Sequence, residues 1–117
     1  MDRLKELFKA KFTVASEEIK TLLKEHGTKV IDQVQIEQVY GGMRGIKSMI
    51  WETSSLDAQE GIRFRGYSIP ELREKLPCID GAKEPLPEGL FWLMMTGEIP
   101  TDDDVRWLSR EWMRRSE

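Results

Sequence analysis

Apolar residues in the first part of the chain recur at the three- and four-residue spacing of helices. They are Leu4, Leu7, Phe8 and Phe12, followed by Ile19, Leu22 and Leu23. Ser16 has two acids directly after it, which predicts the start of a second helix there. Gly27 predicts the end of that helix after His26, because glycine adopts the left-handed cap conformation freely.

The pattern changes to an alternation of period two between Gly41 and Gly66. The alternating positions on the two sides of a polar segment are Met49, Trp51 and Thr53, and then Ile62 and Phe64. The segment between them, residues 56–61, is typical of a turn. We therefore predict a small β-hairpin near residues 49–65 with one buried face.

Three helices are predicted after this hairpin. Ser68 and Glu71 have the spacing of a capping box, and Pro77 prevents the helix from continuing. The next helix begins at Pro87. Its apolar run, residues 90–95, leaves almost no polar face, so we expect this helix to be buried all round.

A last helix begins after Thr101, which has cap spacing to Asp104. The acids at 102–104 suit the positive end of the helix dipole, and we expect a solvated helix start there rather than a cation site. The predicted core stripe is Val105, Leu108 and Trp112. No glycine or proline ends this helix, so we expect the chain to be incomplete as a domain or part of a larger assembly.

Composition excludes several classes of function. The net charge is −3 and no basic cluster is present, which argues against a nucleic-acid partner. The longest apolar run is far below the roughly 20 residues that span a bilayer, so no membrane partner is expected. A single cysteine, Cys78, excludes an internal disulfide. Acids among the first fifteen residues favour a mature amino terminus over a mitochondrial presequence.

The residues offer few candidates for chemistry. One histidine and one cysteine cannot fill a tetrahedral zinc site, so no metal is expected. His26 fits a structural role at a helix end, and a nucleophilic pair with Cys78 is the alternative. We predict no catalytic residue in this chain.

The best candidate for binding is the segment 40–45, YGGMRG. Gly41, Gly42 and Gly45 allow close approach of the backbone, and Arg44 adds a guanidinium, which together could clamp phosphate oxygens. The spacing is not that of a Walker loop or a dinucleotide fingerprint. A structural turn with a solvated arginine is the alternative.

Two long stretches carry a family resemblance. Residues 40–72, YGGMRGIKSMIWETSSLDAQEGIRFRGYSIPEL, and residues 84–101, EPLPEGLFWLMMTGEIPT, resemble citrate synthases of the eukaryotic mitochondrial type. HGTKVIDQVQIEQVYGG and WLSREW are similar to the family in the same order. The resemblance implies a mainly α fold, the helical-bundle portion of the citrate synthase fold with one small hairpin. Residues 1–117 would be the amino-terminal segment of the large domain.

The resemblance also implies an activity. Family members are acyltransferases that condense acetyl-CoA with oxaloacetate and water to citrate and CoA, without a resident cofactor. They act as homodimers in the mitochondrial matrix. The mechanism uses a carboxylate and two histidines, which would lie in the remainder of the chain, so this segment alone is expected to be inactive. Arg44 matches an arginine that contacts the phosphates of CoA, with Gly41, Gly42 and Gly45 shaping its loop.

Two alternatives stay open from the sequence. The chain could belong to a 2-methylcitrate synthase of the same family, because nothing in it senses the extra methyl group of propionyl-CoA. It could also be an independent helical interaction module that exposes residues 90–95 to a partner.

Overall fold

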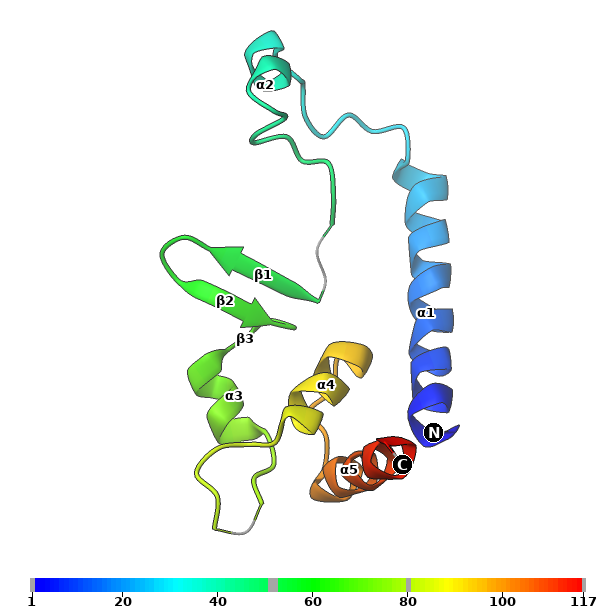
Figure 1. Cartoon of the computed structure of the whole chain (residues 1–117). Helices are drawn as coiled ribbons and strands as arrows, with labels where there is room; N and C mark the ends of the chain where they lie inside the picture. The colour runs from blue at the N-terminus through cyan, green and yellow to red at the C-terminus, as the bar shows by residue number, and fades with distance from the viewer. Residues whose placement is uncertain (1, 51–52, 80, 117) are drawn as a thin grey trace. The chain divides into compact units, whose positions relative to one another are not determined.

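The computed structural model of this chain describes residues 2–50, 53–79 and 81–116. The described residues form five helices and a three-stranded antiparallel sheet, so the expected mainly α fold with a small hairpin is confirmed (Figure 1). The helices are α1 (Asp2–His26), α2 (Ile36–Tyr40), α3 (Ile69–Lys75), α4 (Pro87–Thr96) and α5 (Asp102–Ser116). The strands are β1 (Ser54–Asp57), β2 (Gly61–Phe64) and β3 (Tyr67–Ser68).

The chain divides into two compact units, which we describe separately. The first unit contains residues 1–11 and 52–117, and the second contains residues 12–51. The first ten described residues therefore pack with the second half of the chain. The segment with the candidate binding loop belongs to the second unit.

Helix α1 is continuous, so the predicted helix start at Ser16 is wrong. Neither glycine nor proline interrupts the chain around Ser16, and the strong helix formers Ala15, Glu17 and Glu18 flank it directly. The predicted end after His26 is confirmed. The reason differs from the expected left-handed cap, because a Cβ atom at Gly27 would overlap the carbonyl oxygen of Leu23. Gly27 donates its N–H to that oxygen at 2.9 Å.

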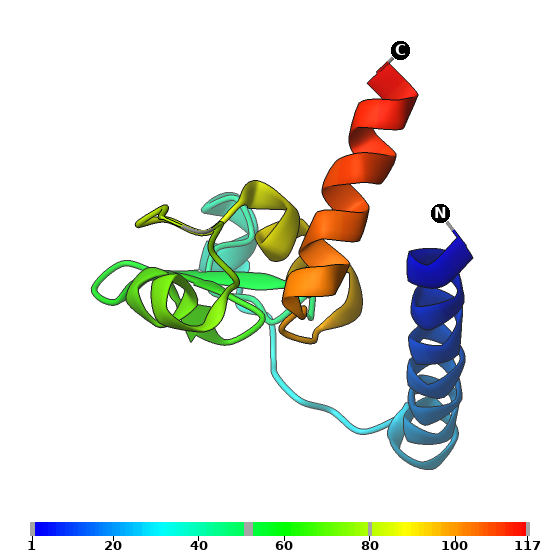
Figure 2. The ribbon, with the colours of Figure 1, turned by 90° about the horizontal axis from the view of Figure 1, so that it is seen from below.

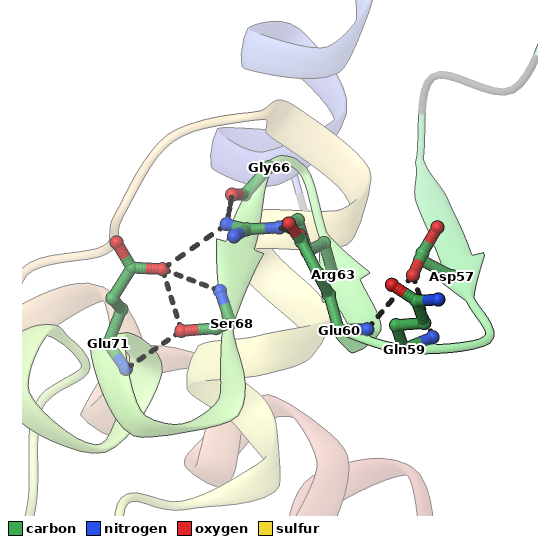
Figure 3. Close-up of polar contacts among 7 residues, drawn as sticks. All are labelled: Asp57, Gln59, Glu60, Arg63, Gly66, Ser68 and Glu71. Atoms are coloured by element: carbon green, nitrogen blue, oxygen red, sulfur yellow. Dashed lines mark hydrogen bonds and ion pairs between the residues drawn. The ribbon is translucent and has the colours of Figure 1, made fainter.

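The predicted hairpin is present, but its strands are shifted along the sequence. β1 pairs with β2 from Ser54 opposite Phe64 to Asp57 opposite Gly61, so the turn is shorter than the predicted 56–61. The Asp57 carboxylate explains this shorter turn, because it accepts hydrogen bonds from the backbone N–H groups of Gln59 and Glu60, at 2.8 and 2.9 Å (Figure 3). These hydrogen bonds also lower the pKa of Asp57.

The residues expected to begin the first strand are not in it. Met49 and Ile50 lie outside any strand and are exposed, while Trp51 and Glu52 lie outside the described residues. A third strand, β3, was not predicted; it pairs Tyr67 with Phe64 across a tight turn. Two residues are too few to give a period-two signal in the sequence.

The capping box that begins α3 is confirmed (Figure 3). The Glu71 carboxylate accepts from the backbone N–H and the hydroxyl of Ser68, both at 2.7 Å. The Arg63 guanidinium lies 3.7 Å from the same carboxylate and donates to the carbonyl of Gly66 at 3.0 Å. The helix ends at Lys75, before the proline, as expected. Local polar groups therefore join the sheet to α3.

A low pH should weaken these polar contacts between the sheet and α3. The bonds from Ser68, first from its backbone and then from its side chain, lower the pKa of Glu71. A carboxyl with a lowered folded-state pKa stabilises the fold above its ordinary pKa, and this contribution is lost as the pH falls. We expect Glu71→Gln to lower the thermal midpoint of the chain at pH 7 and to flatten its dependence on pH down to 3. Glu74→Gln, exposed on the same helix, should change neither.

Helix α4 forms the centre of the first unit, where it touches two hydrophobic clusters. Leu93 is fully buried and packs against Leu72 of α3 and Leu76, the residue after that helix. Trp92, the preceding residue, packs against Leu4 of α1 and Leu108 of α5. α5 lies beside α4 in both views (Figures 1 and 2). The burial of Val105 and Leu108 confirms most of the predicted stripe on α5.

The expectation that α4 is buried all round is wrong for this chain. Phe91 is 38% exposed, and Met94 and Met95 are half-buried. Phe91 meets Trp112 edge to face at 5.2 Å between ring centroids, and Trp112, predicted as core, is 37% exposed. Within the described residues, the two clusters cover only the sides of α4 that carry Trp92 and Leu93.

The side chain of Arg65 connects the hairpin to α4 through hydrogen bonds. The Nε and Nη2 atoms of Arg65 both donate to the carbonyl oxygen of Met94, at 3.1 and 2.8 Å. Arg65 reaches it from a left-handed backbone conformation, with φ of 49°. The carbonyl is one of those left unpaired at the end of a helix, so a two-pronged guanidinium is well suited to it.

The cap of α5 is confirmed, but its last acid is not solvated. Asp104 is 7% exposed, and its Oδ2 atom accepts from the backbone N–H and hydroxyl of Thr101, at 3.0 and 2.7 Å. Its Oδ1 atom lies 2.6 Å from the guanidinium of Arg3 on α1. The expected solvated start therefore holds for Asp102 and Asp103 only, both of which are exposed.

Candidate functional site

The candidate binding loop follows a helix of only five residues, α2. Gly41 ends this helix by donating its N–H to the carbonyl of Glu37 at 2.8 Å. A Cβ atom at Gly41 would lie 3.0 Å from that carbonyl oxygen, which is too close for ordinary contact. Glycine at position 41 therefore suits the tight end of α2, and its role in close approach to a ligand stays a prediction.

The loop then reverses through residues with positive φ. Gly42, Met43 and Gly45 have φ of 79°, 62° and 75°. The N–H of Met43 donates to the carbonyl of Gln38 at 2.7 Å, which closes the loop back onto α2. Arg44 lies between these left-handed positions, in the loop itself and not in a helix or strand.

Arg44 is exposed and carries a positive charge available to a ligand. Among the described residues, no hydrogen bond or ion pair to Arg44 is present. An exposed guanidinium beside a glycine-rich turn can bind phosphate oxygens with two parallel hydrogen bonds. The four predicted residues, Gly41, Gly42, Arg44 and Gly45, thus form one loop with the chemistry of an anion contact.

Two residues of this site were not identified in the sequence. Met43 adopts the left-handed conformation that residues other than glycine avoid, at a cost on the order of 1–2 kcal/mol. No sequence signal indicates this. Gln38 holds the loop through its carbonyl, and its side chain accepts the N–H of Gln35 at 2.8 Å. The capping-box spacing from Gln35 to Gln38 is the signal that could have indicated the second contact.

His26, the last residue of α1, is 3.9 Å from the carboxylate of Glu25. His26 belongs to the second unit and Cys78 to the first, so a pair between them stays a prediction. No group of three or more potential metal ligands occurs among the described residues. In the same part of the chain, none of the helices has the length and apolarity needed to cross a bilayer.

An apolar pocket lies on the side of α4 that the two clusters leave open. It has a volume of about 220 Å³ and is formed by α1, α4 and α5. We call it the aromatic pocket; its aromatic residues are Phe8, Phe91, Trp107 and Trp112. Lys5 and Arg115 also line it. Its lining is apolar apart from these charged groups and Glu111, so it offers no set of polar groups that could orient a substrate.

Comparison with known proteins connects this chain to one family. The family model described as "Citrate synthase, C-terminal domain" matches residues 42–117. The mitochondrial citrate synthase of Neurospora crassa is 60% identical over 114 residues, which is 97% of this chain and 24% of that protein. The mitochondrial citrate synthase of Saccharomyces cerevisiae is 57% identical with the same coverage.

A relative with a different name is equally similar. The mitochondrial 2-methylcitrate synthase of Yarrowia lipolytica is 57% identical over 116 residues, which is 99% of this chain and 25% of that protein. The chain thus spans about a quarter of the length of the curated relatives that it matches. The resemblance seen in the sequence is confirmed, and the chain belongs to the citrate synthase family.

Proposed function

We propose that this chain is the amino-terminal segment of a citrate synthase, an acyltransferase that condenses acetyl-CoA with oxaloacetate and water to citrate and CoA. The observation that carries the proposal is the 60% identity to a named citrate synthase over 97% of the chain. The names of the relatives also support a mitochondrial location, in the matrix. The complete protein would act as a homodimer and need no resident cofactor.

The segment contributes scaffold and one substrate contact. Arg44 binds a phosphate of CoA, and the backbone around Gly41, Gly42 and Gly45 gives its loop the required shape. The exposure of Arg44 and the absence of a partner for it among the described residues support this role. A charge-assisted hydrogen bond of this kind contributes about 1.5–3 kcal/mol to binding.

The segment does not perform the chemistry. The methyl group of a thioester is a very weak acid, so a base must remove its proton while a hydrogen-bond donor stabilises the enolate oxygen. A second donor must polarise the ketone of oxaloacetate. The chain has one histidine, His26, which is exposed at the end of a helix. The remainder of the protein therefore supplies the catalytic histidines and aspartate.

The aromatic pocket supports the view that the segment packs against further protein. Phe91 and Trp112 are each more than a third exposed, and such aromatic surface is normally covered in a stable domain. The neighbours would be other segments of the same family chain, since the relatives are about four times as long as this one.

The name of the Yarrowia lipolytica relative favours one alternative activity, that of a 2-methylcitrate synthase. The two reactions differ by one methyl group on the acyl donor, and no residue of this segment is assigned to bind that group. Turnover of the complete protein with propionyl-CoA against acetyl-CoA distinguishes them, and we expect acetyl-CoA to be preferred.

A chimera tests the proposed function directly. The matched segment of the Neurospora crassa citrate synthase is replaced by this chain, and release of the CoA thiol is followed with acetyl-CoA and oxaloacetate. We expect an active enzyme, whereas the 117-residue chain alone should release no thiol above a blank. An inactive but folded chimera, or turnover by the chain alone, would contradict the proposal.

Within this chimera, Arg44→Ala should raise the KM for acetyl-CoA about tenfold or more, with kcat little changed. The reason is the loss of a contact that is made equally in the ground and transition states. Lys47→Ala removes one positive charge from an exposed position three residues away and serves as the matched control. An unchanged KM in Arg44→Ala would remove this residue from the site.

A further inference from the structure

Gln38 differs from its surroundings in burial. Every other residue from 21 to 45 is exposed, whereas Gln38 is half-buried. It lies in the middle of α2, ahead of the loop that carries Arg44. A polar side chain that is withdrawn from solvent in an otherwise open segment indicates contacts of its own.

Gln38 makes contacts in two directions. Toward the residues that precede it, Gln38 is bonded to Gln35 twice. Its side-chain Oε1 atom accepts the backbone N–H of Gln35 at 2.8 Å, and its backbone N–H donates to the carbonyl of Gln35 at 3.1 Å. On the side of the loop, its carbonyl accepts the N–H of Met43 at 2.7 Å. Its Nε2 atom lies next to Gly45, 3.8 Å from where a Cβ atom on that glycine would be.

Arg44 lies between Met43 and Gly45. Gln38 is bonded to the first of these residues, because its carbonyl accepts the N–H of Met43 at 2.7 Å. The side-chain bond to Gln35 restrains residue 38, and with it the carbonyl that receives Met43. Met43 has a left-handed φ of 62°, so the carbonyl bond from Gln38 holds the strained part of the loop.

We infer that Gln38 is a positioning residue that holds Arg44 in the conformation that binds an anionic phosphate of the acyl-CoA substrate. The inference rests on the proposed function and goes beyond it, because Gln38 itself touches no ligand. Its effect is preorganisation: a loop that is already in its binding conformation loses less freedom when the ligand binds.

The test uses the active chimera and four variants. Gln38→Ala should raise the KM for acetyl-CoA about three- to tenfold with unchanged kcat, the range of one net hydrogen bond. Gln38→Glu keeps an oxygen that accepts the N–H of Gln35 but adds a negative charge near the phosphate site, so we expect an unchanged thermal midpoint together with a raised KM. Gln33→Ala, at an exposed glutamine in the same unit, is the matched control and should change nothing.

The fourth variant combines Gln38→Ala with Arg44→Ala. If Gln38 acts through Arg44, the double variant has the same KM as Arg44→Ala alone, whereas independent effects multiply. Independent effects would overturn the inference, as would an unchanged KM in Gln38→Ala, and both leave the proposed function intact. An unchanged KM in Arg44→Ala overturns the CoA contact and the inference together. Thermal midpoints measured in parallel show that each variant is folded.

Discussion

Replacing Leu93 by alanine is expected to lower the free energy of unfolding by about 3 kcal/mol, within the 2–5 kcal/mol typical of buried leucines. Leu93 has no exposed surface and packs against Leu72 of α3 and the following Leu76. Phe64 and Tyr67 of the sheet also pack against this cluster, so we expect the cavity to collapse only in part. Urea unfolding followed by tryptophan fluorescence measures the effect, because Trp92 is the adjacent residue.

The control for this prediction is another leucine in the same unit. Leu56 of β1 is 79% exposed, so Leu56→Ala should change the free energy of unfolding by no more than about 0.5 kcal/mol. Leu93→Ile keeps the volume and should cost less than about 1.5 kcal/mol. Equal losses in Leu93→Ala and Leu56→Ala would show that the cluster around α4 is not the core of this unit.

The second large effect is expected at Asp104. Asp104→Ala should lower the free energy of unfolding by about 2–3 kcal/mol, because three polar groups lose their partner at once. The N–H and hydroxyl of Thr101 lose the carboxylate that accepts their hydrogen bonds at the start of α5. Arg3 loses an ion pair at 2.6 Å. Arg3 is 54% exposed and can turn to water, so the loss stays below the 3–5 kcal/mol typical of a fully buried pair.

Graded variants separate the cap from the ion pair. Asp104→Asn keeps an oxygen for Thr101 and loses the charge, so we expect about half of the effect. Asp103→Ala removes an exposed acid from the same first turn and should cost at most about 0.5 kcal/mol. A loss as large in Asp103→Ala as in Asp104→Ala would mean that only the helix dipole matters, and not the contact to α1.

The elements that could be predicted from the sequence are those that local chemistry determines. The capping boxes at Ser68 and Thr101, and the proline that begins α4, need only residues within one helical turn. These starts are confirmed. The family resemblance is also confirmed, because long matching stretches are specific without any structure.

The errors arise where distant residues or competing local signals decide. Ser16 has the sequence of a helix start, but no glycine or proline ends the helix before it, so α1 continues through it. The burial of Asp104 depends on Arg3, which is about a hundred residues earlier in the chain. The hairpin shift results from Asp57, whose carboxylate closes a shorter turn than the alternation indicated. Periodicity alone carries none of this information.

The candidate site is intermediate between these cases. Glycine content alone indicated a loop at 41–45, and the positive φ values of Gly42 and Gly45 agree with it. The left-handed Met43 has no sequence signal, since nothing about methionine favours that conformation. The contribution of Gln38 depends on a carbonyl and an amide that face the loop, which only the three-dimensional arrangement reveals.

The placement of Leu4 has a consequence for the order of events during synthesis. Its burial requires Trp92 and Leu108, so Leu4 leaves the ribosome well before the residues that cover it. At ~5–20 residues added per second, the roughly hundred intervening residues take about 5–20 s to appear. Throughout that interval the apolar edge of the nascent first helix stays uncovered, and it is then a natural target for chaperones that bind exposed apolar segments.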